Sequence, residues 1–315
     1  MIPVMHVTSI CVRFLAMPIL SIKHVTTYRY QKPVTFGEHR MMLRPRDDDD
    51  QKVLQSELEI SPKPQSLAWR RDKLGNYVAI VHFADRSDEL RVVNTVCLDH
   101  TPKGFLEFDI KDYARTYPFR YTTADWSRLR PFILPLPLQP ELRQWSDQFF
   151  AKNGSAELHA LLINMTQTIR RTFRHVARHE KGVQEPVCTI AVGSGSCRDL
   201  AILMIAALRS RGIAARFVSG YVHLAERDEE IDHLVTGGNT HAWVQVFVPG
   251  PGWIDFDPSA GAVGSHNLIR VAAVQHPRDA IPLQGTWYGS ASDHLAMQVA
   301  VRVKAALNDG PFVQS

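Results

Sequence analysis

The stretch GSGSCRDLAILMIAALRSRGIAARFVSGYV, residues 193–222, decides the fold of this 315-residue chain. Ser196, with Asp199 three residues later, forms a capping box, which predicts a helix that begins at Cys197. The run 200–208 is apolar throughout, so we expect this helix to be buried on most of its sides. Two arginines and a glycine follow the run and predict where the helix ends.

The first helical position gives Cys197 a chemical bias. The free N–H groups and the positive end of the helix dipole favour a thiolate over a thiol. Gly193 and Gly195 leave the backbone before the cysteine open to a substrate carbonyl, and the N–H of Cys197 can stabilise an oxyanion. The alternative is a buried cysteine that only packs as a small apolar side chain.

A nucleophilic cysteine needs a base, and the segment NTHAWVQVFVPGPGWIDFDPSAG, residues 239–261, offers one. It has the pattern of two short strands around a Pro-Gly turn. His241 begins the first strand and Asp257 ends the second, so a hairpin brings both side chains to one face. There a carboxylate can orient the imidazole that accepts the thiol proton. Asp255, two residues earlier, competes for the orienting role.

Composition excludes several classes of protein. Apolar residues make up 45% and charged residues 22% of the chain, values typical of a globular protein. The net charge of +4 comes from scattered side chains without a long basic run, so nothing favours nucleic acid as a partner. Four cysteines (Cys11, Cys97, Cys188 and Cys197) are too few for a disulfide framework and predict a reducing, cytoplasmic location.

No membrane partner is expected. The first twenty residues are apolar, but Arg13 interrupts them, and no apolar stretch reaches the ~18–20 residues that span a bilayer. We expect residues 1–20 to be an extension outside the two folded domains, with Met17 as the natural first residue.

The remaining pattern predicts two domains. Strand-like alternation, for example over 54–60, marks an N-terminal β-rich domain at residues 21–120. Prolines then interrupt residues 121–140, which we predict to be a linker without regular structure. Helical periodicity follows, with one helix from Pro140 to about residue 152 and another over about 156–177. We assign residues 141–308 to the domain that carries Cys197, His241 and Asp257.

These motifs resemble the bacterial transglutaminase-like family of the transglutaminase-like superfamily. The matching blocks are GSGSCRDLA, GIAARFVSGYV, THAWVQV and GWIDFDPSAG in the C-terminal half. The family's N-terminal region is matched by HVTTYRYQKPVTFGEHRMMLRPR at 24–46 and LGNYV at 74–78, and its closing strands by 282–303.

The resemblance implies an α+β, papain-like (transglutaminase core) fold preceded by an N-terminal antiparallel β-sandwich. It also implies Cys197 as nucleophile, His241 as base and Asp257, rather than Asp255, as orienter. We expect no cofactor and no metal. Animal relatives require calcium, but the acidic run Asp47–Asp50 lacks the ligand alternation and glycine of a calcium loop, and we predict a solvated loop there.

The expected function is acyl transfer on a protein or peptide substrate through a thioester, with hydrolysis slightly favoured over transamidation. A protein-glutamine transglutaminase is the first alternative, and a non-catalytic interaction scaffold is the second. A zinc site is a third possibility, because His175 and His179 stand four residues apart at a predicted helix end, with Cys188 and Cys197 nearby in sequence. The absence of an HExxH or paired CxxC pattern argues against it.

Overall fold

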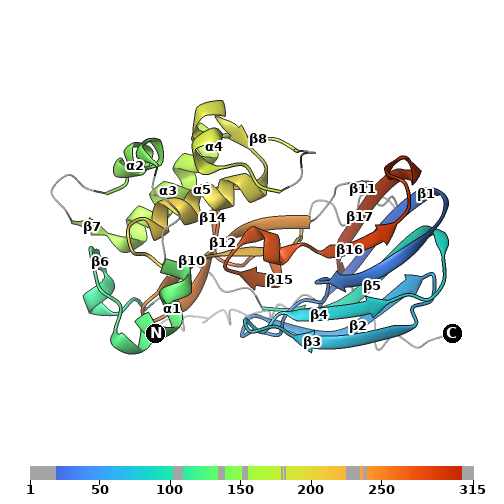
Figure 1. Ribbon diagram of the computed structural model, residues 1–315. Coiled ribbons are helices and arrows are strands. Elements are labelled where there is room, and N and C mark those ends of the chain that lie inside the picture. Colours follow the sequence, from blue (N-terminus) through green and yellow to red (C-terminus); the bar gives the residue numbers. More distant parts are fainter. Residues whose placement is uncertain are drawn as a thin grey trace, which may run out of the picture.

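The computed structural model describes the chain in segments; they are residues 19–101, 109–133, 139–150, 155–178, 180, 182–224, 235–236 and 240–306. Two antiparallel sheets form its two halves (Figure 1). Helices cover one of these sheets, whereas the other is built around a long N-terminal strand. The α+β, papain-like fold with a β-sandwich in front of it is therefore as predicted.

The sandwich is organised by β1 (Ile19–Met41), which belongs to both of its layers. The first part of β1 pairs with β5 (Ser87–His100) and β17 (His294–Ala306). After a register shift between Arg29 and Val34, its second part pairs with β4 (Tyr77–His82) and β16 (Leu283–Tyr288). Aromatic and branched side chains from the two layers, such as Leu90 of β5 and Val81 of β4, fill the space between them. Shorter neighbours complete the layers: β2 (Gln51–Ser61), β3 (Ser66–Arg71) and β11 (Val235–Thr236).

The end of the chain returns to this sandwich. Residues 283–306 fall inside the domain assigned to 141–308, yet β16 and β17 pair with β1 and not with the second sheet. The physical reason is that apolar and polar side chains alternate along β17. Val301 and Val303 therefore bury one face of this strand in the cluster that also holds Leu20 and Ile22 of β1.

The second sheet has the strand order β14-β13-β12-β10-β15, and helices lie against one of its faces (Figure 1). Helix α5 (Cys197–Arg209) lies directly on β12 and β10. The sheet strands are β10 (Ala215–Val222), β12 (Thr240–Val248), β13 (Gly252–Asp257), β14 (Ala262–Val263) and β15 (Leu268–Val274). The other helices are α1 (Thr123–Ile133), α2 (Pro140–Asp147), α3 (Leu158–Thr172) and α4 (Pro186–Val192). Small pairs are made by β6 (Thr116–Tyr117) with β7 (Ala156–Glu157), and by β8 (Arg174–His175) with β9 (Ser194–Gly195); short 3-10 turns are η2 (Asp112–Ala114), η4 (Pro277–Ala280) and η5 (Ala291–Asp293).

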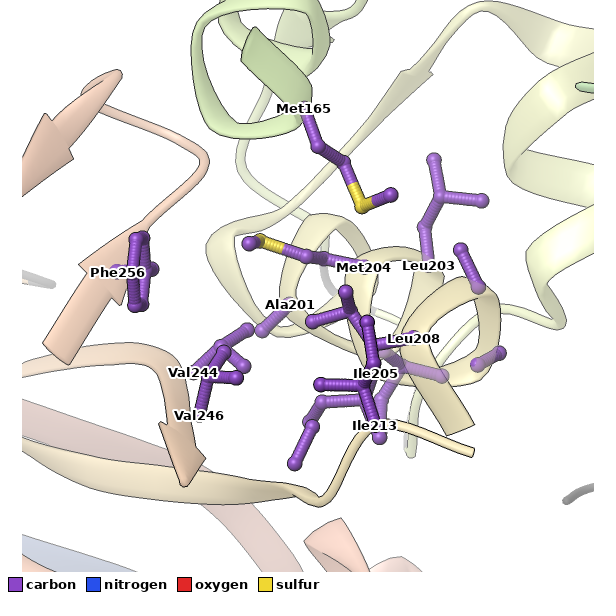
Figure 2. Close-up of a cluster of buried hydrophobic side chains, with 14 of the residues drawn as sticks. Met165, Ala201, Leu203, Met204, Ile205, Leu208, Ile213, Val244, Val246 and Phe256 are labelled. Atoms are coloured by element: carbon purple, nitrogen blue, oxygen red, sulfur yellow. The ribbon is translucent and has the colours of Figure 1, made fainter. Parts of the chain in front are cut away.

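Helix α5 is the centre of the core, as its apolar run predicts. Every residue from Asp199 to Arg209 is buried. Figure 2 shows Met204 of this helix between Met165 of α3 and Val244 of β12. Since truncation of a buried Leu or Met to Ala costs about 2–5 kcal/mol, this layer fixes the helix that carries Cys197.

Three predicted boundaries are wrong. The Pro-rich segment contains helix α1, because Pro131 lies close to the end of the helix and removes a single backbone donor there. The helix that begins at Pro140 ends at Asp147, and the helix predicted over 156–177 ends at Thr172. Phe173 takes an extended backbone at that point and buries its ring in the core.

The two halves of the molecule are joined by an apolar interface and by hydrogen bonds. Leu20 and Ile22 of β1 pack against Tyr221 of β10 in one buried cluster. The side chain of Asn76 donates from Nδ2 to the carbonyl of Ala273 at 3.1 Å. The sandwich is thus packed onto the sheet that carries the predicted site. None of the helices in the described segments is both long and apolar enough for a membrane span.

Candidate active site

The local sequence places Cys197 at the start of α5. The predicted capping box is confirmed, and Ser196 donates its backbone N–H to Oδ2 of Asp199 at 2.8 Å. Gly193 ends α4 with a φ of 67°, a left-handed conformation that favours glycine. A Cβ on Gly195 would stand 2.8 Å from the Cβ of Asp199, so a larger residue there would disturb the cap. The thiol therefore sits at a helix N-terminus whose geometry the neighbouring residues determine.

The predicted hairpin brings His241 and Asp257 together. His241 lies near the start of β12 and Asp257 ends β13, and Nε2 of the imidazole donates to Oδ2 of the carboxylate at 2.6 Å. The other carboxylate oxygen accepts the backbone N–H and the hydroxyl of Ser259, at 2.9 and 2.8 Å, and the N–H of Ala260 at 3.2 Å. Burial opposes ionisation of Asp257, but the bonds to His241 and Ser259 hold its pKa below the ordinary value.

Cys197 is hydrogen-bonded to two imidazoles, those of His175 and His241. Burial opposes a thiolate, but these two hydrogen bonds outweigh it and lower the pKa of Cys197 to about 6. Burial likewise opposes an imidazolium, but Asp257 and Cys197 raise the pKa of His241 to about 10. At neutral pH the arrangement favours a thiolate beside an imidazolium, the reactive form of a cysteine nucleophile.

The contact between His175 and Cys197 was not expected from the sequence. Instead of ending a helix beside His179, His175 lies on β8, which pairs in parallel with β9 just before the cysteine. Val176 donates its N–H to the carbonyl of Gly195 at 3.0 Å, which fixes the register. A single histidine in a charged segment matches no sequence motif. Its position beside Cys197 becomes visible only through the pairing of β8 with β9. His179 lies outside the described residues.

Asp255, the competing carboxylate, has other partners. Its Oδ1 accepts Nε1 of Trp243 at 2.6 Å and its Oδ2 accepts Nη1 of Arg270 at 2.8 Å. Arg270 also binds the carboxylate of Asp50, so the prediction of a solvated loop over Asp47–Asp50 is wrong at this residue. The charge of Asp50 can be buried because Arg270 of β15 pairs with it. This ion pair joins the sandwich to the second sheet.

Of the four residues named for the zinc alternative, His175 and Cys197 lie together, Cys188 is exposed, and His179 lies outside the described residues. Over the described segments, no group of three or more His, Cys, Asp or Glu side chains has an arrangement that could hold a metal ion. Cys97, Cys188 and Cys197 are free thiols, and Cys11 lies outside the described residues. The partners of Cys197 are the imidazoles of His175 and His241.

A cavity of about 240 Å³ borders the thiol and the imidazole. Its walls come from α5 and from β10 and β12 on one side, and from β1 and β17 of the sandwich on the other. Among the described residues, both halves of the chain thus line the space beside Cys197.

Comparison with known families agrees with this architecture. Residues 20–97 match the profile described as the bacterial transglutaminase-like N-terminal region, and residues 144–258 match that of the transglutaminase-like superfamily. An uncharacterized protein of Mycobacterium tuberculosis is 27% identical over 304 residues, which cover 90% of this chain and 91% of the relative.

Two further similarities are partial or structural. A protein-glutamine gamma-glutamyltransferase of Pseudomonas aeruginosa is 29% identical over 138 residues, which are 42% of this chain and 20% of that protein. A solved structure of a candidate cysteine protease from Cytophaga hutchinsonii superposes with a TM-score of 0.67 at 20% identity and covers 95% of each chain. The latter likeness shows that the complete two-part fold occurs in another protein.

Proposed function

The chain belongs to the transglutaminase-like superfamily, and from that premise we propose that it is a cysteine enzyme that transfers acyl groups from peptide or amide bonds through a thioester on Cys197. One observation carries the proposal. The thiol is hydrogen-bonded to His241, and a buried carboxylate holds that imidazole at 2.6 Å through its other nitrogen. Packing alone requires none of these three residue types at these positions.

In the proposed reaction, the thiolate of Cys197 attacks the carbonyl carbon of the substrate amide. The carbon–sulfur bond forms while the carbonyl oxygen takes the negative charge, next to the N–H of Cys197 at the helix N-terminus. When the carbon–nitrogen bond breaks, the imidazolium of His241 gives its proton to the leaving amine. A thioester remains, and His241 is neutral and ready to accept a proton from the next reactant.

The acyl acceptor determines which reaction takes place: water gives hydrolysis, and an amine gives transamidation. We place hydrolysis first, because water needs no second binding site, and a cysteine protease is also what the structural neighbour is proposed to be. Transamidation is the alternative that the Pseudomonas aeruginosa relative supports, since that protein is a glutamyltransferase. In both cases His241 accepts a proton from the incoming water or amine, so the same residues serve both reactions. The cytoplasmic location expected from the cysteines stays a prediction.

The test uses a library of glutamine-containing peptides with and without a primary amine, read by mass spectrometry. Cleavage, or a gain of about 1 Da by deamidation that does not need amine, supports a hydrolase; a mass gain that needs amine supports a transamidase. Cys197→Ala should abolish either product, and Cys188→Ala, which removes an exposed thiol from α4, should abolish neither. If no peptide changes and Cys197 is alkylated no faster than a free thiol, the scaffold alternative is correct.

A further inference from the structure

The cavity beside Cys197 is closed on one side by the sandwich. Met297 and Val299 of β17 and Met42, which follows β1, supply apolar side chains to its wall. Leu283 at the start of β16 belongs to the same side, and Val271 of β15 faces the cavity from the second sheet. Apolar side chains therefore dominate a space that opens directly onto a nucleophile.

The polar groups of this wall are uncharged or already bonded. His24 is hydrogen-bonded to the hydroxyl of Tyr221 at 2.9 Å and to that of Thr26 at 3.0 Å, and burial lowers its pKa to about 4. At neutral pH it is a neutral residue with both ring nitrogens occupied. This contact also ties the sandwich to β10 at the cavity, so the two walls are held in place.

Besides the pair of Cys197 and His241, the charged side chain that lies at the edge of the cavity is Arg198. Its Nη2 donates to the carbonyl of Pro277 at 3.0 Å, and its guanidinium stacks 5.2 Å from the ring centre of Phe217. Among the described residues that line the cavity, none is an Asp or a Glu. A cationic substrate group would find no carboxylate there, and an anionic group would compete with the carbonyl of Pro277 for Arg198.

We propose that this cavity is the subsite for one uncharged, apolar side chain of the acyl donor, and that the N-terminal sandwich sets this preference. The inference rests on the proposed function, because it assigns the substrate class of that same site. A volume of about 240 Å³ lies below the range of about 300–1,000 Å³ typical of sites that hold a whole small-molecule ligand. It suits a single aliphatic or aromatic side chain, while the rest of the substrate lies outside.

The test compares how fast Cys197 is alkylated by iodoacetamide, by N-benzyl iodoacetamide and by iodoacetate, with the labelled peptide identified by mass spectrometry. The three reagents share the iodomethyl group that reacts with the thiolate. They differ in the substituent that would enter the cavity: an amide, a benzyl amide or a carboxylate. We expect the benzyl reagent to label Cys197 at least about tenfold faster than iodoacetamide, because its ring is buried on the way to the thiolate. Iodoacetate should be slower than the benzyl reagent.

Variants on β17 show whether the sandwich is responsible. Met297→Glu places a charge on the cavity wall and should remove most of the benzyl preference, whereas Met297→Leu should keep it. Leu295→Glu is the matched control, because Leu295 is 61% exposed on the same strand, compared with 53% for Met297, and does not line the cavity. This control should keep both the preference and the rate with iodoacetamide.

The outcomes separate the two proposals. A wild-type ratio near one, a ratio that Met297→Glu leaves unchanged, or fastest labelling by iodoacetate overturns the apolar subsite, even if Cys197 itself reacts rapidly. If iodoacetamide labels Cys197 no faster than Cys188 at neutral pH, the proposed nucleophile is wrong and the subsite falls with it.

Discussion

His241 donates from Nε2 to Oδ2 of Asp257 across 2.6 Å, and that carboxylate cannot turn away because its other oxygen accepts three further hydrogen bonds. The imidazole is therefore held at one nitrogen, which leaves Nδ1 for the thiol of Cys197. A hairpin of two short strands supplies this geometry, since His241 and Asp257 stand near the ends of paired strands.

Replacement of the carboxylate tests this relationship directly. In Asp257→Asn an amide takes the place of the acceptor, so the imidazole loses both its fixed orientation and its stabilised charge. We expect kcat for hydrolysis of p-nitrophenyl acetate to fall by orders of magnitude, by analogy with the ~10⁴-fold loss in the serine triad. Asp255→Asn is the control: it should lower stability but keep the rate per folded molecule. A wild-type rate in Asp257→Asn would show that Asp257 is not the orienting group.

The pH dependence of alkylation tests the ion pair. The pKa of Cys197 is lowered to about 6, so its alkylation by iodoacetamide should rise as pH increases through about 6, not near 9 as for an ordinary thiol. The pKa of His241 is raised to about 10, so turnover, which needs the imidazolium proton for the leaving group, should decline as pH passes about 10. The rate of turnover should thus follow a bell-shaped pH profile, with its limbs near pH 6 and pH 10. An alkylation rate that begins to rise only above pH 8 would contradict the pairing.

His175 should change the acid limb of that profile. In His175→Phe the thiolate loses one of its two imidazole partners, while the bond between His241 and Asp257 remains. The pKa of Cys197 should therefore rise, and the acid limb of the alkylation profile should move to higher pH without loss of the basic limb of turnover. His82→Phe, on β4 of the sandwich, is the matched control and should leave the profile in place. An unmoved acid limb in His175→Phe would mean that the contact has no effect on ionisation.

The parts of this site that were predictable from sequence are those that depend on local signals. The capping box at Ser196 and the turn between β12 and β13 each lie within a few residues of the groups they position, so they place Cys197, His241 and Asp257 without knowledge of the rest of the fold. The two Asp residues of β13 have the same strand parity, and only the family resemblance favoured Asp257.

The parts that were missed depend on contacts between distant segments. His175 comes beside Cys197 through the pairing of β8 with β9, and β17 joins the sandwich through its pairing with β1. The sequence suggests that Asp50 is a surface residue, because its partner Arg270 lies far along the chain. Periodicity and propensity describe one segment at a time and cannot supply such pairings.

Arg270 gives the last prediction, which concerns stability. Its guanidinium is 4% exposed and pairs with the buried carboxylates of Asp50 and Asp255, which raise its pKa even though burial opposes its charge. Arg270→Met would leave both carboxylates buried without their cation. We expect a loss of about 3–5 kcal/mol in the free energy of unfolding, measured by urea denaturation at pH 7. Arg278→Met is the control, because that side chain is 80% exposed and its ion pair should contribute less than about 1 kcal/mol.

A second variant separates charge from packing at this position. If the loss comes from unpaired charge, adding Asp50→Asn and Asp255→Asn to Arg270→Met should restore part of the stability, because the buried groups that remain are neutral. If the triple variant is less stable than Arg270→Met alone, packing and hydrogen bonding, not charge, hold this junction together.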